Sequence, residues 1–509
     1  MPVGISSPAR NLFLLGSTGE QTVTNFFKAV DLSASSDGVF LPEAIKYRYG
    51  DDSYTIGGTA SDPQSKRFGW LENRTYNLDN ASSTQVWDDR IESGVPGQSV
   101  FLRSIIFDQV GRIIAVGHGG GTCWIRRYSS AGVLDWQATT FTGDERYLGV
   151  AHDGLAYYVC GHTGPGDDDT AIAYVEKFDD QGNPIWGKAA FFEYDDVLLE
   201  SITIADDGNI LAVGRIDDND GQKGFMLKLD SQTGDVLWDK TITSPKKFNQ
   251  FLTLKESVGL EKIYADGNGQ FYVVGRIQST RSGSLASRGI LIKFDTEGNI
   301  IWQKETPLSA NKSIEFFDVS AETDTEQVIV LGRYYDGIAN DEMGILSKYT
   351  KNGTLLWRRT IKSSRESSDT FSTTVNPPAL DADSSFYYLL FRDESIDTLA
   401  GEPDRYTFGK VSTSGNGLGD FQYSDSTGDL IDYEIVNIDS NIGILQDGSV
   451  TNSVSDLRST PYSADKIVFD DYATNIAGKK RKVSEGLQSF MYSGSPAVRT
   501  VDFETREFT

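Results

Sequence analysis

The stretch Asp207-Gly208-Asn209-Ile210-Leu211-Ala212-Val213-Gly214-Arg215 decides the fold of this chain. It reads as a turn followed by an apolar strand that ends in glycine. After a polar loop come a second strand at 224–230, a tight turn at 232–234 and a third strand, with tryptophan, at 236–240. Asp-Gly and Thr-Gly pairs between apolar runs are signals for hairpin turns. The stretch therefore predicts one antiparallel β-sheet unit.

The same unit recurs along most of the chain. Its strand-ending glycine recurs at Gly58, Gly117, Gly161, Gly214, Gly275 and Gly332, and Phe391 takes that place in a seventh unit. Its aromatic position recurs at Trp87, Trp136, Trp186, Trp238, Trp302 and Trp357, with Phe421 in the seventh unit. The aromatic residues are about 49 to 64 residues apart, as in the longer propeller repeats. Units that each lack a core of their own favour radial closure into a ring.

The sequence thus predicts an all-β fold, a β-propeller of about seven four-stranded blades over residues 41–435. The tryptophans are expected to pack between neighbouring blades. The strand missing from each unit is expected in the less regular stretch before the Asp-Gly turn, as at 201–204 and 251–254.

Two segments lie outside the predicted ring. Residues 1–40 are interpreted as an N-terminal docking segment, in which the apolar spacing over 20–30 predicts one amphipathic helix. Residues 436–509 are interpreted as a C-terminal extension. Its short strand-like runs at 441–445 and 466–469 would form a docking arm or strands that close the ring.

The units resemble bacterial β-propeller repeats in which a Gly-Asn-Val-Tyr-Val-Thr-Gly strand leads to a Lys-Tyr-Asp-x-x-Gly-Asn-x-x-Trp turn. The second half is matched by Gly298-Asn299-Ile300-Ile301-Trp302 and Gly182-Asn183-Pro184-Ile185-Trp186. The resemblance covers most of residues 105–360. It implies a fold and no particular activity.

A second resemblance concerns the start of the chain. Ala9-Arg10-Asn11-Leu12-Phe13-Leu14-Leu15-Gly16, continuing to Asn25-Phe26-Phe27-Lys28, looks like the opening of virion structural proteins from marine tailed phages, cyanophages among them. The resemblance implies a tail, baseplate or fibre component. Its partners would be other virion structural proteins.

Charge and hydropathy limit the partners and the location. The formal net charge of −26 would repel a nucleic-acid backbone. The basic run at 479–482 is interpreted as a solvated turn or a dock for an acidic partner. We find neither a secretory signal nor an apolar run long enough for membrane insertion, so we expect synthesis in a host cytoplasm and a final place in the virion. Cys123 and Cys160 are interpreted as buried free thiols, although a bridge between them stays open.

Propeller enzymes are the main alternative class. Asp230-Ser231-Gln232-Thr233-Gly234-Asp235-Val236-Leu237-Trp238 matches the Asp-x-x-Thr-Gly-x-x-x-Trp turn of quinoprotein dehydrogenases, but in this unit alone. The adjacent cysteines of that family are missing. The turn at 295–302 has too many residues for the sialidase Asp-x-Gly-x-x-Trp turn, and the sequence nominates no carboxylate pair for glycoside hydrolysis. We therefore expect a protein that is not an enzyme and uses no cofactor.

One repeat position carries the candidate site. The residue after the strand-ending glycine is cationic or imidazole in six units: His118, His162, Arg215, Arg276, Arg333 and Arg392. Side chains that share a face of the ring would make a collar able to bind a carboxylate, a phosphate or an acidic sugar. Alternatively, each pairs with a carboxylate or carbonyl of its own blade. A metal site that includes His152 is a third reading.

Two acidic loops, at 167–169 and 217–221, occupy the variable position of the repeat. The loop at 217–221 loosely resembles a calcium loop but lacks its glutamate, and is interpreted as a solvated turn like 167–169.

The first functional hypothesis is a virion scaffold. The second is a recognition module for host-surface glycan, with aromatic and acidic side chains converging near Tyr334-Tyr335-Asp336. The third is an enzyme with its site in the channel.

Overall fold

The computed structural model describes residues 26–31, 40–48, 53–61, 66–77, 82–92, 98–119, 122–140, 145–163, 171–191, 196–218, 221–243, 248–249, 252–253, 256–281, 284–306, 312–322, 325, 327–336, 341–363, 379–391, 405–414, 420–424, 430–437, 458–461 and 468–471. Within these ranges the regular elements are all β-strands. The same ranges hold no helix of the length and apolarity needed to cross a membrane.

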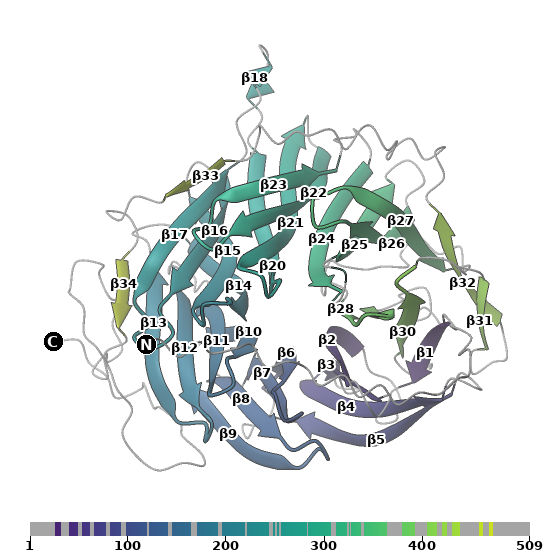
Figure 1. Ribbon diagram of the computed structural model, residues 1–509. Coiled ribbons are helices and arrows are strands. Elements are labelled where there is room, and N and C mark those ends of the chain that lie inside the picture. Colours follow the sequence, from purple (N-terminus) through teal and green to yellow (C-terminus); the bar gives the residue numbers. More distant parts are fainter. Residues whose placement is uncertain are drawn as a thin grey trace.

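The strands form a seven-bladed β-propeller (Figure 1), as the repeat predicts. Blade 1 consists of β2 (Phe40–Arg48), β3 (Ser53–Ser61), β4 (Arg67–Asn77) and β5 (Ser82–Ile91). Blade 2 consists of β6 (Val100–Phe107), β7 (Ile113–Gly119), β8 (Thr122–Tyr128) and β9 (Leu134–Thr140). Blade 3 consists of β10 (Glu145–His152), β11 (Ala156–Thr163), β12 (Ala173–Asp179) and β13 (Pro184–Phe191). The four strands of each blade run antiparallel, from the channel outwards.

The later blades follow the same order. Blade 4 consists of β14 (Asp196–Ile204), β15 (Ile210–Asp218), β16 (Gly221–Leu229) and β17 (Val236–Thr243). Blade 5 consists of β20 (Glu256–Ala265), β21 (Gln270–Arg281), β22 (Ser284–Asp295) and β23 (Ile300–Glu305). Blade 6 consists of β24 (Lys312–Ala321), β25 (Val328–Asp336), β26 (Asp341–Tyr349) and β27 (Leu355–Ser363). The expected strand at 201–204 is thus the end of β14, whereas Leu252 and Thr253 lie in β19 of a separate hairpin.

Blade 7 closes the ring with both ends of the chain. It takes β28 (Ala379–Ala382), β29 (Phe386–Phe391) and β30 (Arg405–Ser412) from the C-terminal side, and β1 (Phe26–Asp31) as its outermost strand. β1 pairs antiparallel with β30 from Phe26 opposite Lys410 to Asp31 opposite Arg405. The helix expected over residues 20–30 is therefore wrong where the structure describes it, because the backbone of 26–30 is paired in a sheet.

The seventh aromatic position was also assigned wrongly. Phe421 lies in β31 (Asp420–Ser424), which pairs with β32 (Leu430–Asn437), and β32 adds to the outer edge of β27 in blade 6. β1 fills the corresponding outer position of blade 7. The repeat spacing could not predict the outermost strand of blade 7, because that strand comes from the N-terminal end of the chain.

In blades 2 to 6 the strand-ending glycines are required by a bulge in the innermost strand. In blade 4 the pairing of β14 with β15 slips between Leu199 and Ser201, leaving Glu200 unpaired, and a Cβ on Gly214 would lie 2.0 Å from the Leu198 carbonyl oxygen. The same close approach occurs at the corresponding glycines of blades 2, 3, 5 and 6, at 1.7–2.1 Å. No side chain fits there, since real contacts of this kind exceed about 3 Å. The repeat glycine therefore marks a β-bulge that turns one extra residue out of the ladder.

The tryptophans join each blade to the next, as expected. Trp238 of β17 donates from Nε1 to the Thr296 carbonyl in the β22–β23 turn of blade 5, at 3.0 Å. Lys228 of β16 donates to the same carbonyl at 3.2 Å. A Cβ on Gly298 in that turn would lie 2.9 Å from the Trp238 ring. Trp136 and Trp302 make the equivalent bonds to the Asp180 and Lys351 carbonyls.

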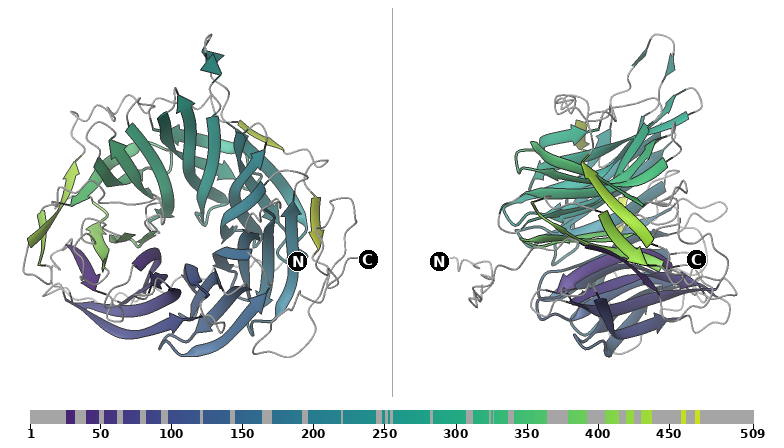
Figure 2. Two further views of the ribbon diagram at one scale, coloured as in Figure 1. Left: turned by 180° about the vertical axis from the view of Figure 1, so that it is seen from behind. Right: turned by 90° about the vertical axis from the view of Figure 1, so that its right-hand side faces the viewer.

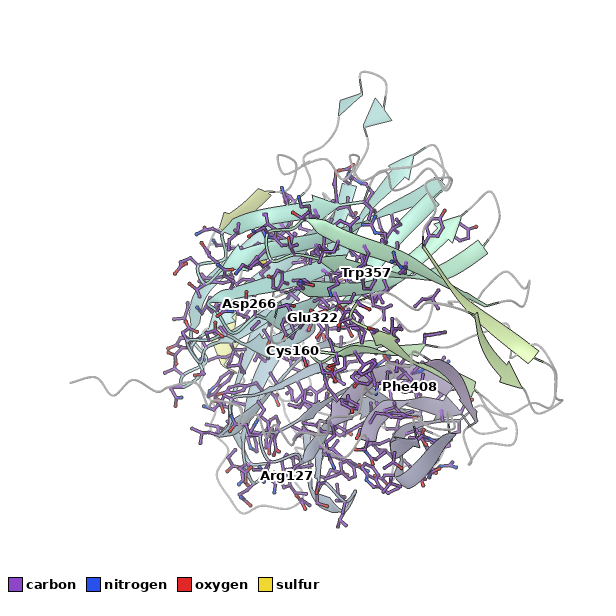
Figure 3. All side chains as sticks on the ribbon, turned by 45° about the vertical axis from the view of Figure 1, so that its right-hand side comes forward. Arg127, Cys160, Asp266, Glu322, Trp357 and Phe408 are labelled. Atoms are coloured by element: carbon purple, nitrogen blue, oxygen red, sulfur yellow. The ribbon has the colours of Figure 1, made fainter. Side chains whose placement is uncertain are left out.

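The hydrophobic core is accordingly divided among the spaces between blades. Each cluster of buried apolar side chains draws on two adjacent blades, and one of them joins blade 7 to blade 1 through Tyr54 stacked on Phe408. Figure 3 shows these packed side chains around the ring, with Trp357 and Phe408 among those labelled. This arrangement leaves a channel at the centre.

Further strands lie on the outer edge of the ring. β33 (Arg458–Pro461) pairs with β17 of blade 4, and β34 (Val468–Asp471) pairs with β13 of blade 3. β31 and β32 cross the side of the ring at blade 6 (Figure 2). The described strands of the C-terminal region, β33 and β34, therefore add to the outer edges of two blades and are not the strands that close the ring. The run at 441–445 lies outside the described residues.

Candidate functional site

The repeat position after the glycine holds an arginine in an ion pair in three successive blades. Arg215 of β15 contacts Glu200 of β14 at 2.6 Å, and Arg276 of β21 contacts Glu261 of β20 at 2.9 Å. Arg333 of β25 contacts Glu315 of β24 at 2.9 Å. Each arginine thus has a carboxylate partner from the innermost strand of its own blade, which is the alternative to an anion-binding collar.

These pairs join across blades into a chain of charges at the bulges. Arg276 also lies 3.9 Å from Glu315 of the next blade. Arg103, the bulged residue of β6, pairs with Glu43, the bulged residue of β2. We call this set the charged belt; it consists of Glu43, Arg103, Glu200, Arg215, Glu261, Arg276, Glu315 and Arg333.

Burial and neighbouring charges shift the pKa values of the belt. Burial raises the pKa of Glu43 to about 7, although Arg103 opposes this shift. Burial also raises the pKa of Glu261, against the effect of Arg276. For Glu315, burial is outweighed by Arg333 and Arg276, and its pKa is lowered. The belt therefore holds carboxyl groups of unequal acidity close together.

The two histidines at the repeat position behave differently from the arginines. Burial, with Arg103, Arg146 and His162, lowers the pKa of His118 to about 2, and its ring stacks on Phe101 at a centroid distance of 4.8 Å. Burial also lowers the pKa of His162, whose Nδ1 lies 2.8 Å from the Thr163 carbonyl oxygen. Burial therefore favours the neutral form of both imidazoles. Arg392 lies outside the described residues.

His152 does not join the other two histidines in a ligand set. It stacks on Tyr157 at a centroid distance of 4.6 Å, and burial lowers its pKa. Among the described residues, no three His, Cys, Asp or Glu side chains are grouped as a metal site. Asp217, from the loop compared with a calcium site, lies 3.7 Å from Arg215 and accepts a hydrogen bond from Gln222 at 2.7 Å.

A pocket of about 400 Å³ occupies the central channel. Its wall comes from the innermost strand of every blade: β2, β6, β10, β14, β20, β24 and β28. Glu43 and Glu200 of the charged belt line it, and Asp206 and Gly267 line it beyond the strand ends. We call it the channel pocket.

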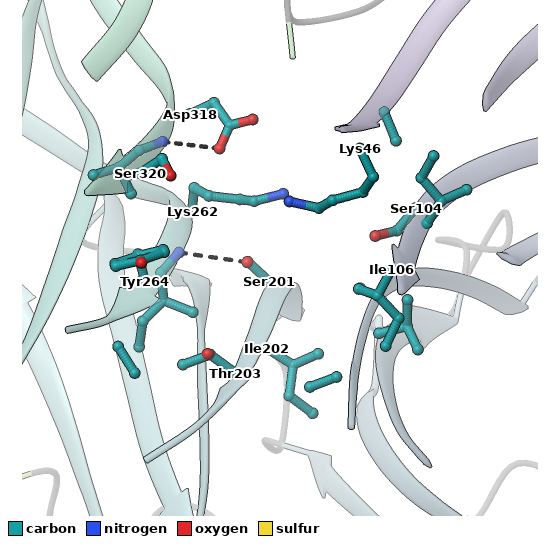
Figure 4. Close-up of a pocket in the computed structure, with 18 of the residues that line it drawn as sticks. Lys46, Ser104, Ile106, Ser201, Ile202, Thr203, Lys262, Tyr264, Asp318 and Ser320 are labelled. Atoms are coloured by element: carbon teal, nitrogen blue, oxygen red, sulfur yellow. Dashed lines mark hydrogen bonds between the residues drawn. The ribbon is translucent and has the colours of Figure 1, made fainter. Parts of the chain in front are cut away.

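Two lysines extend into the channel pocket from opposite walls, Lys46 from β2 and Lys262 from β20 (Figure 4). The Lys46 ammonium contacts Asp381 at 2.9 Å, and its pKa is raised because Asp381 outweighs burial. The Lys262 side chain makes no ion pair or hydrogen bond with the described part of the chain. Hydroxyl groups of Ser104, Ser201, Thr203 and Ser320 surround the pair.

The carboxylates near these lysines already have partners. Asp318 accepts backbone N–H groups of Val319 and Leu380 at 2.8 and 2.9 Å. Asp381 accepts the backbone N–H of Tyr47 at 2.9 Å in addition to Lys46. The Lys262 ammonium is therefore the charged group of the pocket that lacks a contact within the described residues.

The sequence predicted three of the four belt arginines, Arg215, Arg276 and Arg333, and did not predict Arg103, the carboxylate partners or the channel lysines. The signal was present, because Glu200 and Glu261 each precede the paired arginine by 15 residues. Lys262 directly follows Glu261 in the same strand. The innermost strands, between the tryptophan and the Asp-Gly turn, vary in sequence from blade to blade. The spacing of 15 residues between glutamate and arginine therefore does not stand out in the repeat.

Two further sequence interpretations can be placed. Tyr334, named as an example for a glycan-recognition loop face, is a core side chain between blades 5 and 6 with 2% of its surface exposed, so it does not belong to such a face. The side chain of Asp336 lies outside the described residues. Cys123 and Cys160 are both free and buried, as interpreted. Burial raises the pKa of the Cys160 thiol, which keeps it protonated and unreactive.

Comparisons with known proteins assign no family to this chain. No family model and no curated protein matches the sequence. Drosophila Plexin A, solved with Semaphorin 1b, is similar over 83% of this chain and 94% of its own, at 9% identity and a TM-score of 0.40. The polysaccharide lyase Uly1 is similar over 76% of this chain and 100% of its own, at 11% identity and a TM-score of 0.41. Prolyl oligopeptidase B from Galerina marginata is similar over 81% of this chain and 55% of its own, at 12% identity and a TM-score of 0.36.

Proposed function

We propose that this chain is a non-enzymatic virion structural protein of a tailed phage, a tail, baseplate or fibre component, that uses its β-propeller as an assembly scaffold. The observation that carries the proposal is strand addition at the outer edge of the ring. β32, β33 and β34 pair with residues 359–363, 240–243 and 188–191 of three blades. Each pairing begins two residues after the tryptophan of its blade, so the same edge position is used each time.

Other blades offer the same edge. Within the described ranges, no strand pairs with the outer side of β5, β9 or β23 in blades 1, 2 and 5. These outer strands carry exposed apolar side chains, Val86, Leu134 and Ile301. Strand addition to an open sheet edge is a common mode of protein association. The edges therefore support docking of neighbouring subunits on the ring.

The charged groups of the ring support the non-enzymatic part of the proposal. The belt arginines are tied to carboxylates, burial lowers the pKa of His118 and His162 at the repeat position, and both cysteine thiols are buried. The resemblance of residues 9–28 to the opening of marine phage virion proteins supports the virion part, and other virion proteins would be the partners. Most of those residues lie outside the described ranges.

Mass spectrometry of purified particles from the source that encodes the chain tests the proposal. We expect the full-length chain in the particles, at a fixed stoichiometry to the major tail proteins and retained after a high-salt wash. Cryo-electron microscopy should then find the outer edges of blades 1, 2 and 5 against other subunits. Absence from washed particles, or a stable monomer that turns over a quinone or glycan substrate, contradicts the proposal. Binding of the isolated chain to host cells without association with particles would favour a recognition module.

A further inference from the structure

The Lys262 side chain serves no visible purpose in the architecture of the propeller. The lysines that join blades, such as Lys228 and Lys348, are buried and donate to carbonyls of the next blade at 3.2 and 2.7 Å. Lys262 makes no such bond within the described residues and extends into the channel pocket (Figure 4). Long charged side chains cost conformational entropy when they are ordered, so an ordered lysine in a pocket calls for a partner.

Among the innermost strands of blades 1 to 6, the register gives a cation at the place of Lys262 in blade 5 alone. The first paired residue after the bulge is Lys262 in blade 5. In blades 1 to 4 the same place is taken by the small residues Ala44, Ser104, Gly149 and Ser201, and in blade 6 by Asp318. The fold therefore accepts a small residue at this position. The small residue of blade 4, Ser201, leaves space beside the lysine, whereas Asp318 of blade 6 accepts backbone N–H groups.

Lys46 adds a second ammonium group from the opposite wall. It spends one of its three N–H donors on Asp381, and 34% of its side-chain surface stays exposed towards the channel. Two ammonium groups in one pocket repel each other unless an anion lies between them. The nearby carboxylates Asp318 and Asp381 already accept backbone N–H groups, and of the two ammonium groups the described contacts pair only Lys46 with one of them.

The rest of the wall determines what the anion is attached to. Ser104, Ser201, Thr203 and Ser320 place hydroxyl groups around the lysines, and Ile106 and Ile202 supply limited apolar surface. A volume of about 400 Å³ is within the range of small-ligand pockets and suits a single sugar-sized molecule. Hydroxyl-lined walls match ligands that carry several hydroxyl groups of their own.

We propose that the channel pocket binds a small polyhydroxylated anion, an acidic monosaccharide or sugar phosphate, whose carboxylate or phosphate lies between Lys262 and Lys46. This site lies beside the charged belt, whose Glu43 and Glu200 also line the pocket and whose arginines are already paired. It does not depend on the assembly role, because its binding can be measured on the isolated full-length chain.

Isothermal titration calorimetry of the full-length protein at low ionic strength tests this site. The probes are glucuronate, glucose 6-phosphate, inorganic phosphate and uncharged glucose. At the ligand efficiency of ordinary small molecules, we expect a Kd near ~1 mM for the favoured acidic sugar. The stronger of glucuronate and glucose 6-phosphate identifies the anionic group. Glucose should bind at least about tenfold more weakly, since it lacks the charge-assisted bonds.

Variants connect the binding to the lysine. Lys262→Met should weaken binding of the acidic sugar about tenfold or more, and Lys262→Arg should retain most of it. Lys240→Met, the same exchange at the outer edge beside Trp238, is the matched control and should change nothing. Added salt should weaken binding to the wild-type protein, which tests the charge without any variant.

Several results would overturn the inference. These are no binding of either acidic sugar up to ~10 mM, equal binding of glucose, or unchanged affinity in Lys262→Met. Equal affinity for inorganic phosphate and glucose 6-phosphate would show that the hydroxyl wall contributes nothing. Should Lys262→Met fail to fold, insensitivity of wild-type binding to salt would count against the site in its place.

Discussion

Blades 2 to 6 and blade 7 reach the same four-stranded sheet in different ways. Each of blades 2 to 6 takes its four strands from one continuous segment, so neighbours in the sheet are neighbours in the chain. Blade 7 takes three strands from residues 379–412 and its outermost strand from residues 26–31. The ring is thus closed by a pairing across almost the whole described chain. Local turns build the regular blades, whereas a long-range strand pairing completes blade 7, which also packs against blade 1 through the cluster that contains Tyr54 and Phe408.

The two kinds of blade also differ inside. In blades 2 to 6 a bulge in the innermost strand forces a glycine in the next strand. In blade 7, Phe391 stands at that place. β28 pairs with β29 from Ala379 opposite Leu390 onward, so the position that corresponds to the bulge comes before Ala379 and lies outside the described residues. The bulge is described in blades 1 to 6, and the charged belt lies at or near the bulges of five of them, blades 1, 2, 4, 5 and 6.

Removal of the closing strand should have the largest effect. Deletion of residues 1–31 removes six residue pairs between β1 and β30. At about 0.5–1 kcal/mol for each hydrogen bond, the loss is about 3–6 kcal/mol in the free energy of unfolding. Urea denaturation of the deleted and full-length chains measures it. Deletion of residues 1–20 alone is the control, and equal midpoints for all three proteins would show that β1 does not close the ring.

The bulge glycines of the regular blades come next. Gly275→Ala would place a Cβ 2.0 Å from the Gly259 carbonyl oxygen, so the backbone must shift, at a cost of about 3 kcal/mol or more. Gly259→Ala is matched to it in the facing strand, where the nearest atom is 3.4 Å away, and should cost less than about 1 kcal/mol. Thermal unfolding of both variants distinguishes them. Similar losses from the two substitutions would remove the steric reason for the repeat glycine.

These contrasts explain what could be predicted from the sequence. Gly275 and Trp238 are predictable because their partners lie in the same or the next unit, and the repeat brings the unit back many times. The strand β1 was not predictable, because no turn links Phe26 to its partner Lys410. The apolar spacing of β1 also fits a helix as well as a strand. The pairing of Arg215 with Glu200 could not be predicted. The bulge at Glu200 shifts the strand register, and without it the sequence does not show which side chains face each other.

The junction into blade 7 should be more sensitive than a junction between regular blades. Lys348 contacts Glu322 at 2.6 Å and donates to the Thr413 carbonyl of blade 7 at 2.7 Å, and Lys348→Met leaves a buried carboxylate without its cation. We expect a loss of about 2–3 kcal/mol. Lys228→Met at the junction of blades 4 and 5 leaves Asp207 half exposed to water and should cost about 1–2 kcal/mol. Denaturant midpoints of the two variants give the comparison. A larger loss of stability in Lys228→Met than in Lys348→Met would mean that the junction into blade 7 is no more sensitive than a junction between regular blades.

The smallest expected effect is a pH dependence of stability from blade 2, where the repeat position holds His118 in place of the arginine of blades 4 to 6. The folded protein holds the pKa of His118 near 2, mainly by burial and then by Arg103, Arg146 and His162, whereas the unfolded value is near 6.5. Its contribution to stability is therefore complete above pH 6.5 and is lost as the pH falls, by about 1.4 kcal/mol per pH unit. Glu43 acts in the opposite sense, because its raised pKa favours the folded state as the pH falls below about 7.

His118→Phe isolates the histidine from these other groups. Phenylalanine keeps a flat ring against Phe101, and Glu43 is present in both proteins, so the difference between them reports His118 alone. Between pH 7 and pH 5.5 the variant should lose about 1 kcal/mol less than the wild-type protein, measured by urea denaturation at both values. Parallel losses would mean that the imidazole is protonated in the folded state. In that case blade 2 would present a cation to the belt, as blades 4 to 6 do with their arginines.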